Sequence, residues 1–142
     1  MKVSAKTEYA CLAMLELAAH YGSKEPLRIR TIADEHGIPS RFLVQILLQL
    51  KGAGFVASTR GAAGGYQLIK PPQEISLGEV MTAIEGQESD LAGAGPTASP
   101  TARVLKEAWR EVSQVEHDAL YTITFGDLVG RIKRQNENMF YI

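Results

Sequence analysis

Hydrophobic residues recur every three or four positions through most of the chain, a spacing typical of helices packed on a common core. An almost wholly apolar stretch begins after Ser4, which is a good N-cap, and Gly22 follows its end. The pattern predicts helices over residues 5–21, 31–36 and 40–51, with a short strand at 27–29. A short helix, a tight turn and a longer helix form the order of a helix-turn-helix unit.

The helix predicted over residues 40–51 has two unlike faces. We expect the apolar face to be buried; it carries Phe42, Leu43, Ile46, Leu47 and Leu50. The opposite face is free to meet a partner and carries Ser40, Arg41, Val44, Gln45 and Leu48.

Two short β-type runs follow this helix and predict a hairpin. Residues 55–60 and 66–69 flank the glycine-rich turn 61–65, which places Arg60 near the tip. Glycines in such a turn permit positive φ angles, and here they are Gly61, Gly64 and Gly65. Tyr66 and Leu68 on the second strand are expected to anchor the hairpin to the core.

The second half of the chain predicts three elements. Ser76 and Glu79 form a capping box for a helix that ends at Gly86 and turns Leu77, Val80, Met81 and Ile84 inward. Small, turn-prone residues then predict a mobile loop, followed by a long helix from Ser99-Pro100 to about Leu120. A last helix begins near Thr124, with Phe125, Leu128, Val129 and Ile132 turned inward, and residues 135–142 are left unassigned.

These elements suggest a mainly α fold with a small β-hairpin wing and a long dimerisation helix. The expected domain boundaries are 1–86 for a winged helix-turn-helix domain, 87–100 for a flexible loop, 101–134 for the dimerisation and C-terminal helices, and 135–142 for a tail.

The long helix carries an apolar seam with alternating steps of three and four residues, the spacing of a coiled coil. It comprises Leu105, Ala108, Val112, Val115 and Ala119, with Trp109 beside it. The seam predicts the contact of a homodimer. The alternative is an amphipathic helix packed only on its own domain, since fewer than three to four heptads are present.

Charge is unevenly distributed, although the formal net charge of the 142 residues is only −1. Residues 1–70 hold nine Lys or Arg against five Asp or Glu, whereas residues 71–142 hold six against eleven. A basic amino-terminal half suits a module that presents one face to phosphates.

The free face of the helix over residues 40–51 has the chemistry to read DNA in the major groove. Gln45 suits adenine, Arg41 suits guanine or a phosphate, and Ser40 suits a phosphate or a base edge. Val44 suits a thymine methyl group, but it could equally pack on the preceding helix, and Gln45 could simply be solvated. Arg60 suits a narrow minor groove, where negative potential is concentrated. The full expected DNA-binding set is Arg28, Ser40, Arg41, Val44, Gln45, Arg60, Gly61, Gly64, Gly65 and Tyr66.

Several motifs together resemble the Rrf2 family of bacterial regulators, which includes an iron-sulfur cluster regulator, a nitric-oxide sensor and a cysteine-metabolism regulator. The motifs are the opening Ser4–Ala10, Ile38–Leu47, Ala53–Val56, the RGxxGGY wing at Arg60–Tyr66, Ile75–Val80 and Ile123–Leu128. The resemblance implies a homodimeric winged helix-turn-helix protein on a palindromic DNA operator. It also implies that the helix from Ser40 enters the major groove and that Arg60 enters the minor groove.

The chain departs from the family pattern at the cluster site. Cluster-binding members carry three cysteines in the loop that matches residues 87–103, where this chain has none, and thiolates are the usual cluster ligands. Glu8 lies where some members draw a non-cysteine ligand, and Val44 stands where the cluster regulator has an acidic residue that tunes site choice. We therefore expect no metal and no cofactor. The single cysteine, Cys11, is expected to act as a small buried hydrophobe.

The function expected from these observations is a DNA-binding transcriptional regulator, more specifically a repressor, with a protein-interaction module as the alternative. An enzyme is the least favoured class, because His20, His36 and His117 are scattered without a nucleophile or carboxylate at a useful spacing. Neither a membrane-spanning run nor a signal peptide is evident, which favours the cytoplasm. The effector is left open between a small molecule, a partner protein and none.

Overall fold

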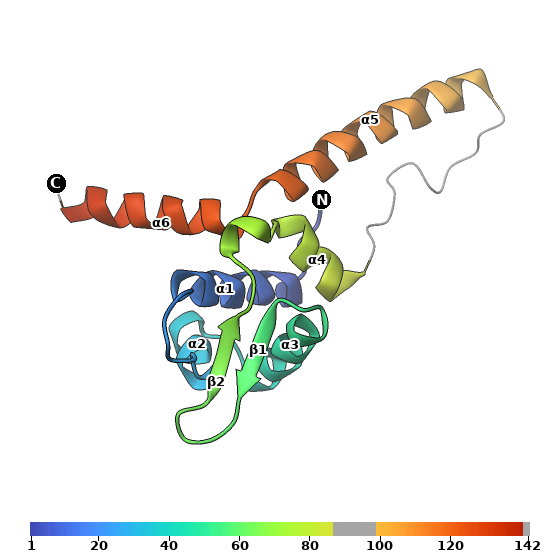
Figure 1. The fold of residues 1–142 in the computed structure, drawn as a ribbon. Helices are drawn as coiled ribbons and strands as arrows, with labels where there is room; N and C mark the ends of the chain where they lie inside the picture. Colours follow the sequence, from blue (N-terminus) through green and yellow to red (C-terminus); the bar gives the residue numbers. More distant parts are fainter. Residues whose placement is uncertain (87–98, 141–142) are drawn as a thin grey trace.

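A computed structural model describes residues 1–86 and 99–140 of the chain, and a small hairpin lies beside its amino-terminal helices (Figure 1). The elements in order are α1 (Ala5–Ala19), α2 (Ile29–His36), α3 (Ser40–Gly52), β1 (Val56–Thr59), β2 (Gly65–Leu68), the 3-10 turn η1 (Pro72–Glu74), α4 (Leu77–Glu85), α5 (Pro100–Thr122) and α6 (Phe125–Phe140). The predicted fold class is confirmed: mainly α with a small antiparallel hairpin. The flexible loop was expected at residues 87–100; residues 87–98 lie outside the described residues, and Pro100 already begins α5.

Helix α1 lies at the centre of the molecule, with α2 and α3 on one side and α4 and α6 on the other (Figure 1). This position explains its apolar sequence, since a helix covered all round needs few polar positions. Ala10, Ala13 and Met14 are completely buried, Thr7 is the one buried polar residue of the helix, and Glu8 remains exposed. Among the described residues, no helix is long and apolar enough to cross a bilayer.

The predicted strand at residues 27–29 was wrong in extent. Only Leu27 pairs, through two backbone hydrogen bonds with Tyr66 of 2.9 and 2.7 Å, and Ile29 already begins α2. The extended residue is Arg28, whose carbonyl accepts from the amide of Ile32 at 3.3 Å and so opens the helix. A β-branched residue such as Ile29 is compatible with either state, so the sequence alone does not decide.

The helix-turn-helix order is confirmed in α2 and α3. Gly37 ends α2 with a φ of 62°, in the left-handed region that glycine adopts without steric cost. The buried face of α3 consists of Leu43, Ile46, Leu47 and Leu50, each fully buried.

Phe42 was expected on that buried face, and this was wrong: its side chain is 49% exposed. Its ring lies 6.4 Å from that of Tyr9, at the edge of the contact between α1 and α3. The four fully buried side chains already fill the interface, and Phe42 lies beside the stripe that they form.

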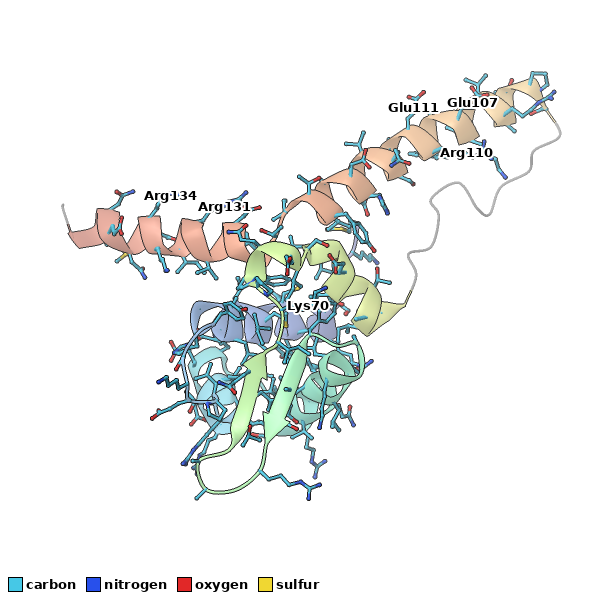
Figure 2. All side chains as sticks on the ribbon, in the orientation of Figure 1. Lys70, Glu107, Arg110, Glu111, Arg131 and Arg134 are labelled. Carbon is cyan, nitrogen blue, oxygen red and sulfur yellow. The ribbon has the colours of Figure 1, made fainter. Side chains whose placement is uncertain are left out.

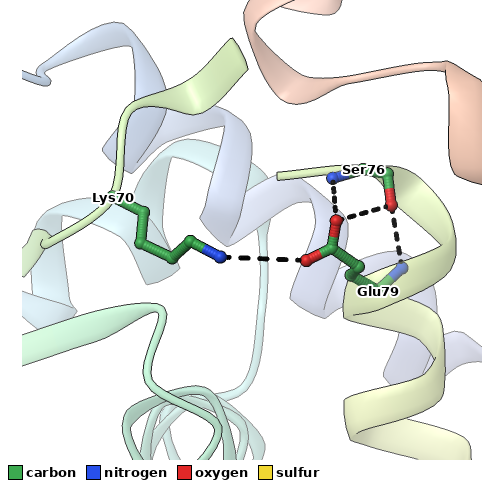
Figure 3. Close-up of polar contacts among 3 residues, drawn as sticks. All are labelled: Lys70, Ser76 and Glu79. Atoms are coloured by element: carbon green, nitrogen blue, oxygen red, sulfur yellow. Dashed lines mark hydrogen bonds and ion pairs between the residues drawn. The ribbon is translucent and has the colours of Figure 1, made fainter. Parts of the chain in front are cut away.

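The hairpin pairs Val56 with Leu68 and Thr59 with Gly65. Its base is tied to α4 by Lys70, whose Nζ lies 3.9 Å from Glu79 Oε2 (Figure 3). Glu79 also completes the predicted capping box, which is confirmed: its amide donates to Ser76 Oγ at 3.2 Å and its carboxylate accepts from the amide of Ser76 at 3.3 Å (Figure 3).

The start of α4 is joined to the junction between α5 and α6. The amide of Leu77 donates to the carbonyl of Ile123, and the amide of Phe125 donates to the carbonyl of Ile75, both at 2.9 Å. Phe125 is fully buried, so this junction is part of the core. The long helix therefore has a fixed base on the amino-terminal domain.

Helices α5 and α6 leave the body in different directions (Figure 1). The predicted inward position of Ile132 was wrong, because it is 42% exposed where α6 extends beyond the body. The helix also continues through Phe140, so the expected boundary at residue 134 does not coincide with a helix end.

Candidate nucleic-acid interface

The outer face of α3 presents a mixed polar and apolar surface. Arg41, Gln45 and Leu48 follow one another at intervals of four and three residues, so they form one exposed row along the helix. Ser40 and Val44 lie beside this row and are also exposed. The fully buried opposite face holds the helix rigidly, and side chains on a rigid helix can be positioned against base edges.

The wing loop depends on glycine at two positions. Gly61 has a φ of 103°, a conformation that other residues rarely adopt. A Cβ at Gly64 would overlap the carbonyl oxygen of Thr59, and the amide of Gly64 donates to the carbonyl of Gly61 at 2.9 Å. This tight turn leaves Arg60 exposed, directly after the end of β1.

Other predicted site residues hold the wing in place. The Arg28 guanidinium donates to the carbonyl of Ala62 in the wing loop. The Cβ of any other residue at Gly65 would overlap the carbonyl oxygen of Leu27. Tyr66 is only 9% exposed and belongs to the core. The position of the wing therefore depends on Arg28, Gly65 and Tyr66.

The C-terminal end of α3 is linked to strand β1 of the hairpin by a side-chain hydrogen bond. Lys51 Nζ donates to Ser58 Oγ at 2.7 Å, linking the last turn of α3 to β1. The hairpin tip points away from α5 and α6, which lie at the opposite pole (Figure 1). Sequence analysis missed the Lys51–Ser58 contact, because a hairpin register cannot be read closely enough to show which residue meets the helix end.

The charges on this surface favour an anionic partner. Arg41, Lys51 and Arg60 are exposed, and α3 contains no acidic residue. The nearest acidic residues in sequence are Asp34 and Glu35 on α2, and Asp34 lies 4.0 Å from Arg30. The surface is locally basic, although the whole chain is close to neutral.

The apolar seam of α5 is exposed in the single chain. Leu105, Trp109, Val112 and Val115 are 53%, 44%, 49% and 70% exposed, and Ala108 and Ala119 are exposed as well. Leu120 is the only buried residue of α5, so the alternative of a seam packed on its own domain does not describe this arrangement. Figure 2 shows the flanking charged residues Glu107, Arg110 and Glu111 on the part of α5 that extends from the body.

The residues present do not fit an iron-sulfur cluster. Cys11 is the only cysteine; burial and the nearby Glu8 carboxylate raise its pKa to about 11, which opposes the thiolate form that binds metal. Within residues 1–86 and 99–140, no three His, Cys, Asp or Glu side chains lie together in a way that could hold a metal ion.

Comparisons with known proteins agree with this geometry. The profile of the Rrf2 family, described as an iron-dependent transcriptional regulator, matches residues 3–131. The HTH-type transcriptional regulator IscR of Vibrio vulnificus is 35% identical over 131 residues, which cover 91% of this chain and 77% of the relative.

Two solved structures have the same fold. CymR, the global cysteine regulator of B. subtilis, superposes with a TM-score of 0.80 at 28% identity, covering 92% of this chain and 98% of that one. IscR of T. potens superposes with a TM-score of 0.76 at 32% identity, covering 93% and 88%. The chain therefore belongs to the Rrf2 family of winged-helix transcriptional regulators.

Proposed function

We propose that the protein is a homodimeric repressor that binds a palindromic DNA operator, with α3 in the major groove and Arg60 in the minor groove. The observation that carries the proposal is that the outer face of α3 and the wing loop are both exposed, basic and distant from the apolar seam of α5. One pole is suited to DNA and the other to a second copy of the chain.

The dimensions of DNA fit this arrangement. The major groove of B-DNA, roughly 12 Å wide, admits one α-helix. A two-fold dimer would place its two copies of α3 on half-sites roughly 34–36 Å apart. The operator is palindromic for the same reason, because each copy reads the same half-site.

Selection of bound fragments from a pool of random DNA duplexes tests the proposal directly. Arg60→Ala and Gln45→Ala should each weaken binding to the selected operator by about 1–3 kcal/mol, and Gln45→Ala should also relax the preference at one base pair. Gln114→Ala on α5 is the control, because this residue lies far from the wing. Unchanged affinity in both site variants would contradict the assignment.

The salt dependence of binding separates DNA recognition from the alternative of a protein-interaction module. Phosphate contacts release counterions, so the affinity for the operator should fall steeply between about 50 and 200 mM salt. Retention of a protein partner at physiological salt, with no DNA bound, would favour the interaction module.

We further propose that the protein acts without an iron-sulfur cluster. The support is the single cysteine with its raised pKa and the absence of cysteine from residues 87–103. Purified protein treated anaerobically with iron and sulfide should retain no stoichiometric iron. Operator affinity should be the same before and after this treatment, and a stable, coloured iron-loaded species would overturn the proposal.

A further inference from the structure

We propose that Leu48, together with Val44, reads the 5-methyl groups of thymine, so that each operator half-site contains thymine at the base pairs beneath α3. This inference rests on the proposed function and names the bases that the site recognises. It assigns a role in base recognition to Leu48, whose side chain is not part of the hydrophobic core.

Leu48 lies on the exposed face of α3, opposite the packed face of the helix. Its side chain is 55% exposed, and that of Val44, one helical turn before it, is 40% exposed. A large part of each apolar side chain therefore faces solvent, which is unfavourable for a hydrophobic residue unless a partner covers it. Neither residue belongs to the hydrophobic core, to which α3 contributes the four fully buried residues of its opposite face.

The surroundings of Leu48 identify DNA as the occupant of this surface. Arg41 and Gln45 lie in the same outer row, and Lys51 lies three residues beyond Leu48. No acidic residue is present on α3, and Lys51 is held at the helix end by Ser58. An apolar spot between cations and an amide complements a duplex groove, where phosphates flank the base edges.

Thymine is the base that offers an apolar group in the major groove. Its C5-methyl projects there, whereas cytosine carries only a hydrogen at C5 and the two purines present hydrogen-bonding groups. Leucine and valine side chains cannot hydrogen-bond, so a methyl group is the feature that they can recognise.

The spacing along α3 relates Leu48 to the expected contact of Gln45. Three residues of helix rise by about 4.5 Å, and successive base pairs are about 3.4 Å apart. Gln45 and Leu48 therefore meet neighbouring base pairs. Because Gln45 suits adenine, whose partner is thymine, the two residues together favour consecutive A·T pairs.

Replacement of thymine by deoxyuracil tests the inference, since it removes only the methyl group and leaves the hydrogen-bonding edge intact. The full-length protein is titrated with the selected operator, in which each thymine is replaced in turn. At one or two thymines in each half-site, removal of the methyl should weaken binding about fourfold. At such a position, an operator with a 5-methylcytosine·guanine pair should bind more tightly than the same operator with an unmethylated cytosine·guanine pair, because the methyl group restores part of the apolar contact.

Protein variants decide whether Leu48 makes this contact. Leu48→Ala should weaken binding to the thymine operator and should no longer distinguish thymine from deoxyuracil at the thymine that Leu48 contacts, whereas a thymine contacted by Val44 should keep its methyl effect. Leu48→Met, which keeps an apolar side chain of similar volume, should retain the discrimination. Circular dichroism confirms folding, which an exposed position should not disturb.

Two results would overturn the inference. One is a tight operator that tolerates deoxyuracil at every position, and the other is a Leu48→Ala variant that retains the full methyl effect. In both cases the proposed function stands, because specific binding is still observed. Failure to select any operator would instead overturn the proposed function together with this inference.

Discussion

Gly65 is a residue at which the backbone of the wing passes close to the rest of the domain. A side chain there would overlap the backbone of Leu27, which pairs with Tyr66 on the same strand. Gly65→Ala should therefore displace the hairpin and destabilise the protein by about 1–3 kcal/mol, the usual range for overpacking. Operator affinity should fall as well, because Arg60 moves with the wing. Chemical denaturation and DNA titration measure the two effects.

Gly130→Ala is the matched control for this variant. Gly130 lies in α6, and a Cβ there would make only an ordinary contact with Arg134, 3.5 Å away. Alanine is the better helix former, so the control should be stabilised by about 0.5–1 kcal/mol. Equal stability of the two variants would show that the close approach at Gly65 is unimportant.

Glu85 gives the protein a pH dependence at the junction of α1 and α4. Its carboxylate accepts hydrogen bonds from the hydroxyls of Ser4 and Thr7, the latter at 2.6 Å, and these bonds lower its pKa below the ordinary value of 4.5. A carboxyl group with a lowered pKa in the folded state stabilises the fold above its unfolded pKa, and this contribution disappears as the pH falls through the folded value.

We expect Glu85→Gln to reduce the loss of stability on acidification below about pH 4.5. The measurement is the urea midpoint at several pH values, with Glu25→Gln as the control for removing an exposed carboxylate. Asp127, whose pKa is lowered by hydrogen bonds from Thr124, should preserve part of the acid sensitivity in both variants. Parallel pH profiles for wild type and Glu85→Gln would rule out this role.

At the scale of elements, the capping box of α4 connects three parts of the molecule. Glu79 contacts both Ser76 and Lys70 at the base of the hairpin (Figure 3), and the residues around Ser76 pair with the junction of α5 and α6. Ser76→Ala should destabilise the whole domain by about 1 kcal/mol, since it removes a buried N-cap.

The N-cap of α5 provides a comparison for this variant. Ser99 Oγ accepts from the amide of Ala102 at 3.0 Å, but this residue is exposed at the end of α5 that extends from the body. Ser99→Ala should fray that end and leave the denaturation midpoint of the domain nearly unchanged. Hydrogen exchange reports the fraying of α5, and thermal melting reports the stability of the domain. Equal losses of domain stability in Ser76→Ala and Ser99→Ala would contradict the different roles of the two caps.

The elements were predictable from the sequence where strong local signals mark them. The capping box at Ser76, the left-handed glycine at Gly37 and the glycine-rich turn of the wing each determine the local backbone. The hairpin was obtained in this way, whereas the buried face of α3 followed from its hydrophobic spacing and was correct except at Phe42. The start of α2 at Ile29 was not, because this residue is compatible with strand or helix.

The burial of individual residues was less predictable, because it depends on what faces each helix. Phe42 and Ile132 both continue an apolar stripe in the sequence, yet both are exposed. Phe42 lies at the edge of its interface, and Ile132 lies in the stretch of α6 over residues 131–139, where every residue is exposed. Figure 2 shows the basic side chains of Arg131 and Arg134 on the same helix. Periodicity identifies a stripe but not the length over which a partner covers it.

The whole molecule has an exposed apolar seam at one pole and a basic surface at the other. The four large side chains of the seam, each at least 44% exposed, are a poor surface for a monomer, since large apolar patches generally mark an interface. If the seam joins two copies, the spacing between their α3 helices is fixed by α5. A substitution that disrupts the seam should then abolish both dimerisation and operator binding.

Val112→Glu tests this connection at the middle of the seam. Two glutamates at a two-fold contact would be buried close to each other, and burial of unpaired like charges opposes association. We expect the variant to be a folded monomer by sedimentation or light scattering, with operator affinity reduced at least tenfold because one half-site contributes alone. Gln114→Glu adds the same charge to α5 away from the seam and should remain dimeric. A Val112→Glu protein that still dimerises and binds the operator normally would exclude the seam as the dimer contact.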